Sequence, residues 1–468
     1  MARPAQLNAY DLTLRFQVGG ALTAQELATA LEVTQPTISR GLARLGESVV
    51  ALGSARRARY ALRRSVRAAG ERWPVYRVDA TGRASEWAHV HALHGGFWVD
   101  WAGEAPAWAD RALDREGFLD GFLFFLSDLR PQGFLGRQQA RRVAEALRLP
   151  VDPRLWSDDD TLVFLQAEGD DLPGDLVMGD APLRRVLTRA LDATTEVTDA
   201  MVAEGAREVR YPELAARASA GGAGGSSAGG KQPKFLTALR GDNGAVQAVL
   251  IKFSPPMDTP VGRRWADLLA AEAQALTVLA EHGLATAGVR VLDAGGRRFL
   301  EVARHDRVGA RGRRGVVSLD ALHGAFDVGG AVTDWPAAAE ALARGELIDV
   351  AGLDVVRRLH SFGELIGNAD MHFGNLAFWL DDALPFRPTP AYDMLPMGWA
   401  PSTQGEVVER TFVPRAPLPC VRPAWAEAAT WAGEFWRRVA ADAAVSAEFR
   451  EIARRAGDHV ERMRGLFA

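Results

Sequence analysis

The sequence predicts a protein of mixed α/β (α+β) class that begins with a small helix-turn-helix unit, and three observations support this. Residues 22–45 hold two short amphipathic segments, each preceded by a residue that commonly caps helices. Short, largely apolar stretches at 235–240, 245–253 and 299–303 predict strands. Apolar residues at helical spacing over 353–366 predict an amphipathic helix. With 468 residues, the chain is long enough for two or three domains.

Residues 1–67 have the outline of a winged helix-turn-helix. Thr23 and Glu26 form a capping-box pattern that opens a first helix, and a second helix carries an apolar stripe that includes Ile38 and Leu42. In such a unit the second helix enters the major groove of DNA, and a strand hairpin called the wing contacts the backbone. A small helical bundle without a DNA-related function is the alternative.

Two strand-like segments, Val49–Leu52 and Arg59–Leu62, follow around a basic tip and predict the wing. The side chains that we expect to face DNA are Gln35, Thr37, Ser39, Arg40, Arg44, Arg56 and Arg57. The charge of this segment supports DNA binding. Ten Arg and four acidic residues give 1–67 a net charge of +6, whereas the whole chain carries −4. A basic segment on an acidic body predicts a nucleic-acid contact confined to that segment. A solvated arginine-rich surface is the simpler alternative.

Residues 68–205 carry no motif that indicates chemistry, and we expect them to form a connecting region and an N-terminal subdomain. The predicted strands are 74–78, 97–101 and 161–165, and the predicted helices are 118–126 and 138–147.

Lysine is confined to one short window of the sequence. Of 55 basic residues only Lys231, Lys234 and Lys252 are Lys. Lys offers a compact ammonium group where Arg offers a planar fork. A nucleotide phosphate site is one place where that difference matters, so the window predicts such a site.

The elements around these lysines support a nucleotide-binding lobe. A Gly-rich stretch at 218–230 precedes two predicted strands joined by a hairpin turn, and the second strand ends on Lys252. This is the arrangement by which kinase-like folds cover and hold a nucleotide. The following helix bears Glu272, a candidate partner for Lys252. Residues 225–231 also match most of a Walker A pattern, but Gln232 stands where a magnesium-binding hydroxyl is required, so we set a P-loop aside.

The loop from Gly367 to Asn375 carries the predicted catalytic chemistry. Asp370 and Asn375 have the Asp-x-x-x-x-Asn spacing of protein-kinase catalytic loops. In that pattern the carboxylate accepts the proton of the attacking hydroxyl, and the amide oxygen binds a magnesium ion that bridges the phosphates. Asp393, eighteen positions later, is the second candidate metal ligand. His372 is expected either to contact phosphate or to stabilise the loop.

These motifs resemble the signature of the HipA family, the serine/threonine kinases of toxin–antitoxin systems. Residues 367–375 and 390–394 are similar to the catalytic and metal segments of that family, 227–234 to its phosphate loop, and 304–307 to its Arg-Phe-Asp-Arg segment with His305 in place of Phe. The winged helix at the N-terminus resembles the YjjJ-like branch. The resemblance implies a two-lobed kinase-like fold of HipA type with a mainly helical C-terminal lobe.

The resemblance also assigns roles and boundaries. It implies ATP and Mg²⁺ as cofactors, Asp370 and His372 as catalytic residues, and Asn375 and Asp393 as metal ligands. The ATP-binding residues would be Ser227, Gly229, Gly230, Lys234, Lys252, Ala303 and His305, the last two through the hinge backbone. Ser227 or Ser226 would be the autophosphorylation site that inactivates the kinase. The expected domains are 1–67 (winged helix), 68–205 (connecting), 206–310 (nucleotide-binding) and 311–468 (catalytic).

The expected partners are a protein substrate and a DNA operator, with an antitoxin and a homodimer as further candidates. Membrane association is not expected, because no run of about 18 apolar residues occurs. Because the chain has the single cysteine Cys420 and no secretory pattern, we expect a cytoplasmic protein. Two rival functions are a transcription regulator with a ligand-sensing kinase-like domain and a small-molecule phosphotransferase.

Overall fold

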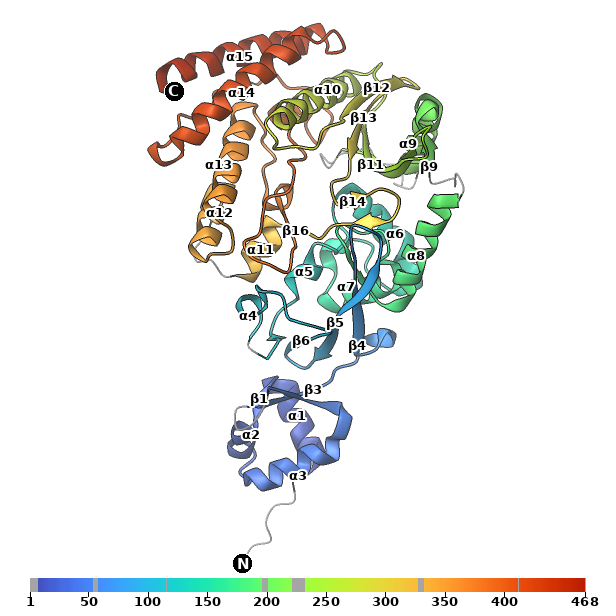
Figure 1. The fold of residues 1–468 in the computed structure, drawn as a ribbon, viewed down its shortest axis with the longest axis vertical. Coiled ribbons are helices and arrows are strands. Elements are labelled where there is room, and N and C mark those ends of the chain that lie inside the picture. The colour runs from blue at the N-terminus through green and yellow to red at the C-terminus, as the bar shows by residue number, and fades with distance from the viewer. Residues whose placement is uncertain are drawn as a thin grey trace, which may run out of the picture.

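The chain forms three consecutive regions that are stacked along the long axis of the molecule (Figure 1). The computed structural model describes residues 7–53, 58–114, 116–195, 201–220, 232–326, 332–410 and 412–467. Helices and strands are mixed throughout, which confirms the predicted class. Among the described residues, none of the helices is both long enough and apolar enough to span a bilayer.

The N-terminal region contains three helices and a small antiparallel sheet. The elements are α1 (Ala9–Gly19), β1 (Leu22–Thr23), α2 (Ala24–Ala30), α3 (Gln35–Leu45), β2 (Val49–Leu52) and β3 (Arg59–Leu62), with strand order β1-β3-β2. The predicted capping box of Thr23 and Glu26 is present. Thr34 occupies the N-cap of α3 as expected, but its hydroxyl pairs with Thr37 at 3.0 Å and does not cap the helix.

Arginines tie this region to the next one. Arg59 pairs with Asp114, Arg64 with Asp159 at 2.5 Å, and Arg67 with Asp160. These basic side chains therefore hold two parts of the chain together. The net charge of +6 thus overstates the positive charge that the N-terminal region can offer to a nucleic acid.

The middle region is built on a five-stranded antiparallel sheet with strand order β7-β6-β5-β4-β8. The strands are β4 (Arg72–Val78), β5 (Ala84–Leu93), β6 (Gly96–Trp101), β7 (Phe118–Leu119) and β8 (Leu176–Met178). The helices are α4 (Ala109–Ala112), α5 (Phe124–Ser127), α6 (Gly133–Leu147), α7 (Asp158–Glu168) and α8 (Asp180–Thr195).

Two predictions for this region were wrong. The strand expected at 161–165 lies inside α7, which Ser157 and Asp160 open with a capping box. Most side chains of α7 are wholly or partly buried, so its sequence lacks the polar face that normally reveals a helix. The helix expected at 118–126 is instead the short strand β7 followed by α5, because Phe118 pairs with Trp98 in the sheet.

The C-terminal half begins with a second five-stranded sheet of order β12-β13-β11-β10-β9. The strands are β9 (Met201–Ala203), β10 (Lys234–Arg240), β11 (Val246–Phe253), β12 (Arg290–Ala294) and β13 (Arg297–Ala303). Helix α9 (Arg207–Ala220) packs on one face and α10 (Pro260–Glu281) on the other, since Ile251 clusters with Tyr211 of α9 while Leu300 clusters with Leu269 of α10. β9 lies before the predicted boundary at 205 yet pairs with β10. The boundaries themselves stay predictions.

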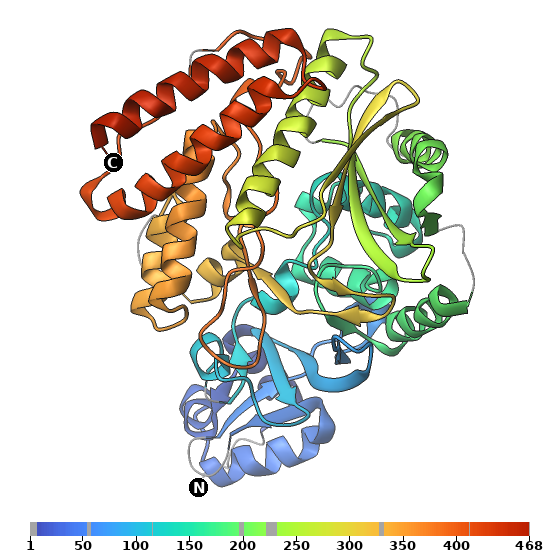
Figure 2. The ribbon, with the colours of Figure 1, turned by 45° about the horizontal axis from the view of Figure 1, so that its top comes forward.

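Helices dominate the remainder. They are α11 (Leu319–Ala325), α12 (Trp335–Arg344), α13 (Val350–Leu365), α14 (Arg422–Ala441) and α15 (Ala447–Phe467), together with the strand pair β16 (Val316–Ser318) and β17 (Ala377–Trp379). Figure 2 shows α14 and α15 side by side at the edge of this lobe. One hydrophobic core runs from the middle region through α10 and α13 to α15. The lobe that carries the predicted catalytic loop therefore shares its hydrophobic core with the middle region.

Candidate active site

The two lysines that the structure describes lie opposite each other on neighbouring strands. Lys234 of β10 is the cross-strand partner of Lys252 of β11. Side chains alternate along a strand, so Phe235 and Ile251 face α9 while the two lysines face the side of α10. Like charges directly opposite each other destabilise a sheet. Negative groups are therefore required on this face.

Two carboxylates meet that requirement. The ammonium group of Lys252 forms ion pairs with both Glu272 of α10 and Asp393. The Lys252 and Glu272 side chains are 4% and 1% exposed, whereas that of Asp393 is 29% exposed. Burial lowers the pKa of Lys252, but Asp393 and Glu272 outweigh burial and hold it above its usual value. Lys252 is thus a buried, fixed positive charge whose accessible partner is Asp393.

Asp393 is held in an unusual backbone conformation. Its φ of 51° lies in the left-handed region, which non-glycine residues rarely adopt. The Asn368 amide nitrogen donates to its carbonyl oxygen at 3.3 Å and thereby supports this conformation. Burial raises the pKa of the Asp393 carboxyl, but the charges of Lys252 and Lys234 outweigh burial. The pKa of Asp393 therefore lies well below its usual value, and the group is ionised. The carboxylate is therefore suited to bind a cation.

The predicted catalytic loop begins where α13 ends. Gly367 has a φ of 72°, and a Cβ at this position would lie 2.5 Å from the Trp399 ring, so only glycine fits. The Asp370 side chain is exposed, and its backbone N–H donates to Asn368 Oδ1 at 3.0 Å. The Asn375 amide nitrogen donates to the Asp370 carbonyl at 2.7 Å. This leaves the Asn375 amide oxygen, the atom that a hard metal ion prefers, for another partner.

His372 shapes the loop. It caps the short 3-10 helix Phe373–Asn375, with its Nδ1 accepting from the Gly374 N–H at 3.1 Å. Its carbonyl oxygen accepts from Trp335 Nε1 at 3.1 Å. The imidazole is exposed, so the structural role found here leaves the predicted contact with phosphate a proposal.

Two contacts that the sequence did not reveal lock the loop to the Asp393 segment. Asn368 bridges Asp370 and Asp393 through its amide, and the Tyr392 hydroxyl donates to the Gly374 carbonyl at 2.9 Å. The available signal in the sequence was an amide residue, Asn368, two positions before the predicted catalytic Asp370. The structure therefore brings Lys234, Lys252, Glu272, Asp370, Asn375 and Asp393 into one cluster of side chains, which we call the cleft after its predicted role.

The predicted hinge residues lie at the end of β13. Ala303 pairs with Val249 of β11, and the Arg304 N–H donates to the Ala248 carbonyl at 3.0 Å. The His305 ring stacks on Tyr392 with the ring centroids 5.8 Å apart and meets Trp379 edge-on at 5.6 Å. An aromatic cluster therefore continues the hinge toward the Asp393 segment.

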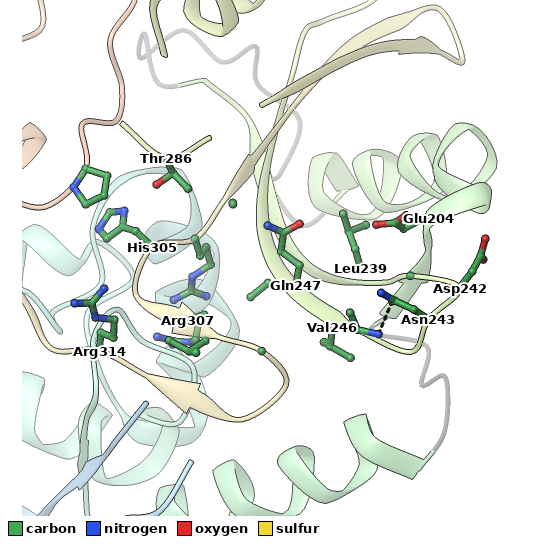
Figure 3. A pocket seen from close by; sticks show the side chains of 18 of the residues that line it. Glu204, Leu239, Asp242, Asn243, Val246, Gln247, Thr286, His305, Arg307 and Arg314 are labelled. Atoms are coloured by element: carbon green, nitrogen blue, oxygen red, sulfur yellow. Dashed lines mark hydrogen bonds between the residues drawn. The ribbon is translucent and has the colours of Figure 1, made fainter. Parts of the chain in front are cut away.

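A cavity of about 890 Å³ opens beside the hinge. In Figure 3 its two walls are the hinge side, with His305, Arg307 and Arg314, and the β10–β11 hairpin, with Asp242, Asn243 and Gln247. Its lining includes Ala303 and His305 but neither Lys252 nor the catalytic loop. The cavity thus lies beside the hinge and shares no lining residue with the cluster around Lys252.

Part of the prediction falls outside the described residues. Ser226, Ser227, Gly229, Gly230 and Lys231 of the Gly-rich loop do so, as do Arg56 and Arg57 of the wing tip. On α3 the side chains of Gln35, Ser39, Arg40 and Arg44 are exposed, and that of Thr37 is partly buried. Figure 1 shows α3 at the end of the molecule away from the other regions.

A metal ion would need ligands beyond histidine and carboxylates. Among the described residues, no three His, Cys, Asp or Glu side chains are grouped as a metal site. Magnesium commonly takes only one or two protein oxygens and fills its octahedron with water and phosphate. The ionised Asp393 and the amide oxygen of Asn375 fit that chemistry.

Comparison with known proteins identifies the family. A family described as "YjjJ-like toxin, middle domain" matches residues 69–187, and the "HipA-like C-terminal domain" matches residues 226–463. Toxin YjjJ of Escherichia coli (strain K12) is 37% identical over 435 residues, or 93% of this chain and 94% of that protein. This chain belongs to the family of YjjJ-like toxins. The predicted resemblance to the HipA family and its YjjJ-like branch is confirmed.

Two solved structures match this chain at lower similarity. A chain of the Shewanella oneidensis MR-1 complex of HipA, HipB and operator DNA is 15% identical, with a TM-score of 0.49, over 84% of this chain and 97% of that one. The Helicobacter pylori proinflammatory kinase CtkA is 11% identical, with a TM-score of 0.35, over 51% of this chain and 90% of that one. At these scores neither likeness supports a conclusion about function.

Proposed function

We propose that this YjjJ-like protein is an ATP- and Mg²⁺-dependent serine/threonine protein kinase of HipA type. The observation that supports the proposal is the cleft itself. A buried lysine is anchored by Glu272 and Asp393, next to a loop that presents Asp370 and Asn375 in kinase order.

Each side chain then has a defined task. Lys252 and Lys234 place positive charge on the phosphate groups of the nucleotide, and the backbone of Ala303 and His305 receives the adenine edge. Asp370, whose side chain is exposed, accepts the proton of the attacking serine or threonine hydroxyl. Asp393 and Asn375 would hold Mg²⁺, which would neutralise the charge of the transferred phosphoryl group. Phosphorylation of Ser226 or Ser227 would inactivate the enzyme.

The N-terminal region gives this kinase a second proposed property, which is DNA binding. The exposed polar face of α3 and the antiparallel β2–β3 hairpin have the order and spacing of a winged helix-turn-helix. Arg40 and Arg44 are exposed and have no ion-pair partner among the described residues, although Arg40 Nε donates to the Pro36 carbonyl at 3.3 Å. An antitoxin and a homodimer stay predictions.

Substitution of Asp370 tests the proposed chemistry. Purified protein is incubated with γ-labelled ATP, Mg²⁺ and a cell extract, and label is followed in protein and in small molecules. Asp370→Ala should reduce transfer by about a thousandfold without changing the melting temperature, because the side chain is exposed. Asp381→Asn is the matched control, since that exposed carboxylate pairs with Arg387.

The outcome separates the rivals. Label in a metabolite would favour a small-molecule phosphotransferase. Nucleotide binding with no transfer in the wild type would favour a ligand-sensing regulator. Undiminished transfer by Asp370→Ala would refute the assigned base.

A further inference from the structure

Buried charges join the middle region to the C-terminal half immediately after the hinge. The middle region contributes residues 169–175 between α7 and β8, which we call the clamp loop. The C-terminal half contributes residues 304–313, which include the short strands β14 (Arg307–Val308) and β15 (Gly312–Arg313). None of the roles proposed above requires this contact.

Asp306 is the centre of the cluster. Its carboxylate accepts from Arg304 Nε at 3.0 Å, from Arg307 Nη1 at 2.6 Å and from the Gly174 N–H of the clamp loop at 3.0 Å. Burial raises the pKa of Asp306, but Arg304 and Arg307 outweigh it and hold the carboxyl ionised. The Asp306 carboxylate therefore connects the two residues that flank His305 in the chain, Arg304 and Asp306, to the middle region.

Two arginines extend the contact to the clamp-loop backbone. Arg307 donates to the carbonyl oxygens of Leu172 at 2.6 Å and Gly174 at 3.0 Å. Arg313 donates to the Asp170 carbonyl at 2.7 Å. Bonds from a rigid guanidinium to main-chain carbonyls are directional. They fix the position of one backbone relative to the other, which non-directional apolar packing does less well.

The hinge is thus held from both sides. On one side the Arg304 N–H bonds to the Ala248 carbonyl of β11. On the other side the Arg304 and Asp306 side chains reach the clamp loop. Recognition of a base edge by backbone groups requires placement within a few tenths of an ångström, and β13 ends at Ala303. The segment beyond that strand end needs a second support.

We propose that the middle region positions the hinge for adenine, with Asp306 and Arg307 as positioning residues that act through the backbone of His305. The inference rests on the proposed nucleotide site and adds to it the task of the YjjJ-type middle region. It predicts that loss of the clamp contacts weakens recognition of the base and leaves recognition of the phosphates unchanged.

Binding of two ligands that share the phosphates distinguishes these effects. Dissociation constants of Mg·ATP and of inorganic tripolyphosphate with Mg²⁺ are measured for the full-length protein by calorimetry. Asp306→Asn should weaken ATP binding about tenfold and change tripolyphosphate binding less than twofold. Arg307→Lys retains the charge but loses the fork, so it should weaken ATP binding about threefold. This milder variant also decides the question if Asp306→Asn fails to fold.

Arg185→Met is the matched control, because Arg185 pairs with Asp170 of the same loop at 2.8 Å without touching the hinge. It should leave both constants unchanged. The inference would be overturned if Asp306→Asn and Arg307→Lys weakened the binding of both ligands equally or changed the binding of neither. The same loss of ATP binding in Arg185→Met would also overturn it. So would a wild type that binds tripolyphosphate but not ATP. A wild type that binds ATP without transferring phosphate refutes the kinase proposal, while the comparison of constants still decides the role of the clamp loop.

Discussion

The cleft and the buried cluster of Arg304, Asp306 and Arg307 against the clamp loop, which we call the clamp, both bury cations against carboxylates, but they use different cations. In the cleft Lys252 contacts Glu272 and the partly exposed Asp393. In the clamp Arg304 and Arg307 surround Asp306 and reach backbone carbonyls. Lysine is a compact charge that can exchange one partner for another, whereas the arginine fork makes several directional bonds at once. From this comparison we expect ligands to exchange in the cleft and the contacts of the clamp to persist.

Changing the cation of the cleft should have the largest effect. Lys252→Arg keeps the charge, but the longer, planar group does not fit a side-chain site that is 4% exposed. We expect kcat/KM for ATP to fall at least about a hundredfold, measured with labelled ATP. The reciprocal Arg307→Lys change in the clamp serves as the comparison. A Lys252→Arg enzyme that retains more than a third of the activity would contradict the distinction between the two sites.

The second prediction concerns a carboxylate of the clamp loop, and its effect on stability is smaller. Burial raises the pKa of Asp175 to about 6, although Arg77 opposes this shift. Because the folded pKa exceeds the unfolded one, the stability from this group is present below the unfolded pKa and is lost as pH rises through about 6. Between pH 5 and 7 the wild type should lose about 1 kcal/mol from this source.

Urea unfolding of Asp175→Asn over the same pH range measures this contribution. The variant should lack this part of the pH dependence, whereas Asp381→Asn, which changes an exposed carboxylate, should retain it. Identical pH profiles for the wild type and Asp175→Asn would show that the carboxyl titrates normally. The Asp175 carboxyl would then titrate like an exposed carboxylate, which would contradict its burial in the clamp loop.

The smallest effect is expected for arginines of the N-terminal region. Arg40 is exposed on α3, whereas Arg59 pairs with Asp114. Arg40→Ala should weaken binding to a random-sequence duplex a few-fold and reduce the slope of log K against log salt by about one. Arg59→Ala should leave the slope unchanged. Equal slopes for the wild type and both variants would show that Arg40 of α3 does not contact DNA.

Local signals in the sequence predicted α2, α3, the β10–β11 hairpin and α13 well, but not α1. Capping residues, turn residues and apolar periodicity act through residues that are close in the sequence. The strands at 49–52 and 59–62 were therefore predicted with the correct bounds. Predictions failed in the middle region, where α7 is buried on most sides and β7 is only two residues long. In both places contacts between distant segments outweigh local preference.

The sequence by itself determined which residue types form the candidate site. The restriction of lysine to 231–252 and the Asp370–Asn375 spacing pointed to phosphate chemistry before any fold was known. Only the tertiary structure decided the partners. It paired Lys252 with Asp393 across 141 positions, joined Asp393 to Asn368, and assigned Arg59, Arg64 and Arg67 to an interface. The physical reason is that charge and periodicity are local properties, whereas the partner of a buried charge depends on which distant segments the core brings together.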